Sequence, residues 1–118
     1  MARLDVNFDP RQLARRLSRS LDDVVASLIG ADDAKAFVAA LEMNGTVWRE
    51  IETYSAAMGW RVPKKTVDFA LAASARARRG VDDSDVEALI TINMRVAGKI
   101  DQACTPGGDL DIHIDAPP

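Results

Sequence analysis

The residues best suited to metal or acid–base chemistry lie together near the C-terminus. The single histidine, His113, alternates with Asp109, Asp111 and Asp115, so these four side chains would share one face of an extended chain. Carboxylate oxygens and an imidazole nitrogen are competent metal ligands. We interpret the segment as a solvated acidic tail, and the chain carries no glycine-rich phosphate loop, nucleophile elbow or zinc spacing. The sequence therefore predicts no enzyme, no metal and no cofactor.

Cys104 is the only cysteine, so no disulfide can form within the chain. A reactive thiol needs a neighbouring base or positive charge that stabilises the thiolate. Lys99 and Asp101 provide a mixed electrostatic setting instead. We therefore predict that Cys104 is a small apolar residue at a helix end.

A first group of cations, Arg15, Arg16 and Arg19, lies in the early turns of a predicted helix. The positive end of a helix dipole favours acidic residues there, so these arginines do not serve the helix itself. They form either a solvated helix face or a set of contacts with a partner. We retain all three as candidate partner-binding residues.

A second group of cations surrounds a predicted loop. Trp60 could stack on a nucleic-acid base, while Lys64 and Lys65 could contact phosphates. Further cations in the same region are Arg61, Arg76, Arg78 and Arg79. The net charge of −3 argues against a general binder of polyanions. Trp60, Lys64 and Lys65 therefore remain candidates for a partner surface, with RNA as the less favoured partner.

Apolar residues at helical spacing predict four helices, over residues 10–29, 33–58, 63–79 and 84–103. Asp9 and Pro10 are typical of a helix start, and Gly30 is a candidate left-handed residue at the end of that helix. Asp32 and Asp33 provide the N-terminal cap of the next helix. Ser84 and Glu87 have the spacing of a capping box, which predicts the start of the last helix.

The predicted helix over residues 33–58 carries an apolar stripe, and we expect the other helices to pack against it. Its members are Phe37, Leu41, Asn44, Trp48, Ile51, Ser55 and Met58. The pair Asn44-Gly45 favours turns, but the stripe keeps its phase on both sides, so the helix should continue through it. A close approach by another helix would explain Gly45.

Two asparagines lie on apolar stripes, Asn44 on this helix and Asn93 on the last one, with Gly98 beside the second stripe. A buried amide without a partner costs about 1–3 kcal/mol. We therefore predict that both asparagines are buried and hydrogen-bonded, either to backbone groups or to each other. Trp48 should lie mostly in the core.

These patterns predict an all-α protein, a compact bundle of about four helices with extended or disordered termini. Residues 1–9 would form an extended arm, residues 10–104 the helical domain and residues 105–118 a flexible acidic tail. The start of the chain lacks the apolar run of a signal peptide, and no apolar segment approaches the ~20 residues that cross a bilayer. We expect a cytoplasmic protein that does not bind membranes.

Two segments carry a family resemblance. Residues 40–48 read ALEMNGTVW and residues 89–98 read LITINMRVAG. They are similar to the A-L-x-x-N-x-x-x-W stretch and the closing L-I-x-I-N-x-x-I-A-x-G stretch of the FlaF family, small regulators of flagellin synthesis in flagellated alphaproteobacteria. Pro63 and the basic helix after it fall between the two segments, as in that family. Asn44, Trp48, Asn93 and Gly98 are the motif positions.

The resemblance implies a non-enzymatic cytoplasmic protein that is needed to make or export flagellin. Such a protein would bind flagellin as a secretion chaperone, or act with the regulator FlbT on flagellin expression. The terminal helices of flagellin are amphipathic, and a helical bundle can hold such a helix in a groove. A direct effect on flagellin messenger RNA is the alternative.

Overall fold

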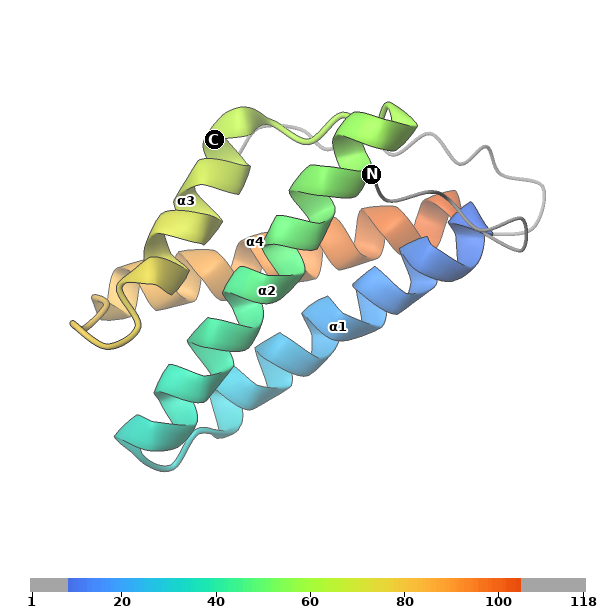
Figure 1. The fold of residues 1–118 in the computed structure, drawn as a ribbon. Helices are drawn as coiled ribbons and strands as arrows, with labels where there is room; N and C mark the ends of the chain where they lie inside the picture. Colours follow the sequence, from blue (N-terminus) through green and yellow to red (C-terminus); the bar gives the residue numbers. More distant parts are fainter. Residues whose placement is uncertain (1–8, 105–118) are drawn as a thin grey trace.

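The computed structural model describes residues 9–104, except for the side chain of Met58, and these residues form an all-α bundle (Figure 1). The four helices are α1 (Pro10–Gly30), α2 (Ala34–Met58), α3 (Lys64–Ala75) and α4 (Asp83–Ala103). The predicted fold class is confirmed. None of these helices is long and apolar enough to cross a membrane. The predicted arm before Asp9 and the predicted tail, with its candidate metal ligands, lie outside the described residues.

Aspartates begin the first two helices, as their sequence context predicts. The side chain of Asp9 accepts a hydrogen bond from the backbone N–H of Arg11 at 2.9 Å, and that of Asp33 accepts one from Ala36 at 2.8 Å. Each bond satisfies a backbone donor that has no partner within the helix. Helix α2 then runs without a break through Asn44 and Gly45.

The helix ends differ from three expectations. Gly30 is still helical, and α1 stops because Ala31 turns to an extended conformation at φ −67° and ψ 119°. Helix α3 ends at Ala75 rather than at residue 79, and the following turns lead to Gly80, whose φ is 105°. Helix α4 begins at Asp83, so Ser84 already lies inside it and the predicted capping box does not form.

Helix α1 packs against both α2 and α4, whereas α3 packs mainly against α2. The expectation that α2 alone is the central helix is therefore wrong. Helices α1 and α4 run antiparallel, and they are the two most closely associated helices (Figure 1). The backbones of α2 and α4 stay apart, and side-chain hydrogen bonds connect these two helices. The fully buried large side chains include Leu17, Leu21, Leu41, Trp48, Ile51, Leu89 and Ile100.

The contact between α2 and α3 depends on a glycine. A Cβ atom built on Gly45 would lie 3.0 Å from Cβ of Ser74, so the predicted close helix approach at Gly45 is confirmed. Gly98 on α4 has a different setting, because it is exposed and a Cβ atom there would meet nothing within 4 Å. Helix packing therefore explains the glycine at residue 45 but not the one at residue 98.

Candidate functional site

A chain of hydrogen bonds connects α2, α3 and α4 in the core. The indole N–H of Trp48 donates to Oδ1 of Asn93 at 2.8 Å, and Nδ2 of Asn93 donates to Oδ1 of Asn44 at 2.8 Å. Nδ2 of Asn44 donates in turn to Oγ of Ser74, whose hydroxyl donates to the carbonyl of Ala70, both at 2.8 Å. Asn44, Trp48 and Asn93 are each 0% exposed, which confirms the predicted burial.

This network has a structural role in the bundle. Each amide oxygen accepts a bond and each amide nitrogen donates one, so the cost of removing the amides from water is largely offset. Hydrogen bonds need defined distances and angles, whereas apolar contacts tolerate sliding. The network therefore holds the register of the three helices. It also joins the two segments, residues 40–48 and 89–98, that resemble the FlaF family.

The arginines near the start of α1 lie beside the end of α4. Nη1 of Arg11 donates to the carbonyl oxygen of Ala103 at 3.3 Å, and Nη2 of Arg15 donates to that of Cys104 at 3.4 Å. Carbonyls in the last turn of a helix lack partners within the helix and carry its partial negative charge. Arg15, a candidate partner-binding residue, thus contributes to holding α4 against α1.

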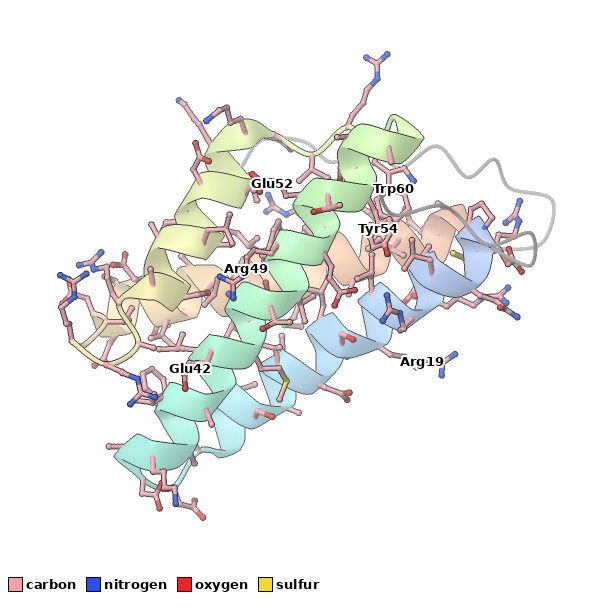
Figure 2. All side chains as sticks on the ribbon, in the orientation of Figure 1. Arg19, Glu42, Arg49, Glu52, Tyr54 and Trp60 are labelled. Atoms are coloured by element: carbon pink, nitrogen blue, oxygen red, sulfur yellow. The ribbon has the colours of Figure 1, made fainter. Side chains whose placement is uncertain are left out.

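The other two arginines on α1 have different surroundings. Arg16 forms an ion pair with Glu50 of α2, with 2.8 Å between Nη2 and Oε2. Arg19 is exposed and forms no ion pair with the residues that the structure describes. Of the three candidates on α1, Arg19 is therefore the one whose charge remains open to a partner (Figure 2).

Cys104 ends α4 as a buried residue, which is the role predicted for it. Its thiol donates a weak hydrogen bond to the carbonyl of Arg11 at 3.9 Å. Burial raises the pKa of the Cys104 thiol, although the nearby Arg15 and Arg11 oppose that shift. The thiol is therefore protonated at neutral pH, and this environment does not activate it as a nucleophile.

Trp60 does not offer the free ring face that stacking on a nucleic-acid base requires. Its side chain is buried in the core, with 6% of its surface exposed. Its indole N–H has no hydrogen-bond partner among the described atoms. The loop position predicted an accessible side chain, but the indole packs under the turn between α2 and α3 (Figure 2). The prediction that Trp60 is exposed and can stack on a base is therefore wrong.

The second group of cations is divided between the two ends of α3. Arg61, Lys64 and Lys65 are exposed at its start, and Lys64 pairs with Asp68 at 2.9 Å. The arginines after the helix lie about 18 Å further along its axis, the length of a 12-residue helix. Two of these arginines form ion pairs. Arg78 lies 3.4 Å from the carboxylate of Glu42, and Arg76 lies 4.0 Å from the carboxylate of Asp85. They do not extend the first cluster into one basic face.

An open hollow of about 850 Å³ lies between α2 and α3. Glu42, Arg49 and Glu52 line its α2 side (Figure 2), and Arg78 and Arg79 contribute from the turn after α3. Small or partly buried residues line the rest, among them Gly45, Leu71, Ser74, Ala75 and Ala77. Sequence reasoning missed this site, because Glu42, Arg49 and Glu52 look like an ordinary solvated face of α2.

A second hollow of about 530 Å³ adjoins the first. It lies nearer the start of α2, where its lining includes Ala34, Lys35 and Val38. Glu42 and Arg78 line both hollows, so the two hollows meet at this ion pair. We call the two hollows together the α2 channel.

Within residues 9–104, no group of three or more His, Cys, Asp or Glu side chains is arranged to hold a metal ion. No protein-family model matches the chain, and no match is found among the curated proteins or the solved structures.

Proposed function

We propose that the protein is a non-enzymatic regulator of flagellum biogenesis of the FlaF type. It binds flagellin in the cytoplasm, either as a secretion chaperone or to promote flagellin synthesis. One observation carries this proposal. The two segments that resemble the family supply Asn44, Trp48 and Asn93 to a single buried network. The resemblance thus rests on residues that contact one another across the bundle, and a chance match of two short motifs does not require this.

The α2 channel supports a binding function. Amphipathic helices bind in grooves through apolar side chains that recur at helical spacing. The terminal helices of flagellin have this character, so such a groove could hold one of them. A partner regulator such as FlbT would then bind a different face of the bundle.

Binding of flagellin messenger RNA is the second candidate. The exposed cations Arg61, Lys64 and Lys65 at the start of α3 favour it. Two observations weaken it: Lys64 is paired with Asp68, and the buried indole of Trp60 offers no stacking surface. Only a small part of the cationic surface therefore remains for phosphates.

The test is recovery of bound partners from a flagellated alphaproteobacterial host, followed by titration of the purified protein with purified flagellin. We expect flagellin to be recovered after RNase treatment and to bind in the titration. Recovery of flagellin transcripts with a steep salt dependence, and no binding of purified flagellin, would favour the RNA function instead. Failure to bind either macromolecule would refute both.

A further inference from the structure

We propose that the α2 channel binds an amphipathic helix whose polar side carries carboxylates. This inference deepens the proposed function. It rests on that function in one respect, namely that the ligand of the channel is a segment of a protein. Three features of the channel support it: length, charge and an apolar floor.

The channel is elongated. It follows α2 from Ala34 to Glu52, a distance of about 27 Å for the rise of an α-helix. A compact small molecule would fill only one of the two hollows. A helix of about five turns has the combined length of both hollows.

The charges that line the channel are mostly positive, although the whole chain has a net charge of −3. The cations are Lys35, Arg49, Arg78 and Arg79, and the carboxylates are Glu42 and Glu52. Opposite charges across an interface favour the correct partner and speed association. A carboxylate-bearing helix therefore complements this channel, whereas a basic helix does not.

Two of these arginines are available to a partner. Arg49 and Arg79 are exposed and form no ion pair with any residue in the described part of the chain. The guanidinium group can hold a carboxylate through two parallel hydrogen bonds. Arg78 and Glu42 do pair, but their side chains are 79% and 52% exposed, so this ion pair is weak and can rearrange around an occupant.

The floor of the channel suits an apolar anchor. Gly45 and Ala75 have little or no side chain, and Leu71 and Val38 are only partly buried. An aliphatic side chain placed above Gly45 would cover the exposed part of Leu71. Gly45 lines the hollow, and its close contact with Ser74 keeps α2 and α3 together beneath it.

The experiment uses two synthetic amphipathic peptides of equal length with the same leucine stripe. One carries glutamate on its polar side and the other carries lysine. Each is titrated into the isotope-labelled full chain, with amide resonances and affinity as the readouts. We expect the glutamate peptide to shift the amide resonances of Gly45, Thr46, Leu71 and Ala75, and to bind at least about tenfold more tightly than the lysine peptide.

Charge reversal provides the matched comparison. Arg49→Glu with Arg79→Glu should weaken binding of the glutamate peptide about tenfold or more. Arg95→Glu with Lys99→Glu changes the net charge equally, at sites on α4 outside the channel, and should change the affinity much less. Thermal unfolding of both double variants checks that they remain folded.

Three results would overturn the inference: no binding of the glutamate peptide, equal binding of both peptides, or resonance shifts centred on α1. Titration of the same variants with purified flagellin separates this inference from the proposed function. Flagellin that binds the unmodified chain and the channel variants equally would refute the channel alone. Flagellin that fails to bind, while the glutamate peptide occupies the channel, would refute only the flagellin assignment.

Discussion

Asn93 of α4 donates its side-chain amide to the side-chain oxygen of Asn44 on α2, at 2.8 Å, and neither residue is exposed. The bond joins two helices whose backbones do not closely approach each other. The indole N–H of Trp48 donates to Oδ1 of Asn93, an oxygen atom that would otherwise be buried without a partner. The pair therefore connects α4 to the unit that α2 and α3 form.

Replacing Asn93 by alanine should destabilise the fold by about 2–4 kcal/mol, because the indole N–H of Trp48 and Oδ1 of Asn44 both lose their partner. Urea unfolding measures this change. In a double-mutant cycle with Asn44→Ala we expect a coupling of about 0.5–3 kcal/mol. Strictly additive effects would show that the two amides do not depend on each other.

Two glycines on helices provide a matched pair for a packing test. Gly98→Ala should stabilise the protein by up to about 1 kcal/mol, because alanine is the better helix former and the site is open. Gly45→Ala should instead lower stability by about 1 kcal/mol, because the new methyl group would displace Ser74 from its bonds to Asn44 and Ala70. The free energies of unfolding are compared in urea. A gain in stability at both sites would contradict the close contact at residue 45.

Arg15→Gln should loosen the end of α4, because it removes a cation that donates to the carbonyl of Cys104. We expect a loss of about 0.5–1 kcal/mol and faster amide hydrogen exchange in the last turn of α4. Arg19→Gln is the control, since Arg19 is exposed on the same helix. Equal exchange rates in the two variants would argue against this role for Arg15.

Cys104 should react slowly with a thiol reagent such as DTNB in the native protein at neutral pH. Burial shields the sulfur and raises the pKa of its thiol, so little thiolate is present. In denaturant the reaction should accelerate by more than about tenfold, as expected for an exposed thiol. Native reactivity equal to that of the denatured chain would show that the end of α4 opens frequently.

The stability of the protein should depend on pH through Asp22. Partial desolvation of the carboxyl, together with the nearby Asp101 and Asp23, raises the pKa of Asp22 above its ordinary 3.8, although the residue as a whole is exposed. A raised pKa in the folded state means that ionisation of this group destabilises the fold, so its favourable contribution is complete at low pH and is lost as the pH rises through the folded pKa.

Asp22→Asn should therefore raise the midpoint of thermal unfolding at pH 7, and the gain should disappear once the pH falls below 3.8. Asp32→Asn removes one carboxylate at an exposed site outside the helices and serves as the control. A gain for Asp22→Asn that persists at low pH would have a cause other than this ionisation.

Most of the fold follows from local patterns. The helical spacing of apolar residues predicts all four helices, and the aspartates at residues 9 and 33 predict the starts of α1 and α2. The same stripes predict the burial of Asn44, Trp48 and Asn93. The failures concern helix ends such as Gly30 and Ser84, because a shift of one residue changes which side chain can cap a helix.

The candidate site depended on contacts between distant parts of the chain. Arg15 bonds to a carbonyl 89 residues away, and nothing near it in the sequence indicates that partner. From the sequence, Trp60 is expected to be an exposed loop residue, but in the structure its side chain is buried in the core. The α2 channel is lined by residues of α2, of α3 and of the turn after α3, where α3 approaches α2 at Gly45.

Which segments are helical, and which face of each helix is apolar, can be read from the sequence alone, because these properties depend on residues within a few positions of one another. The pairing of polar groups and the position of the open channel become visible only in the folded bundle. Those outcomes depend on how the helices pack, and packing is set by the shapes of side chains that lie far apart along the chain.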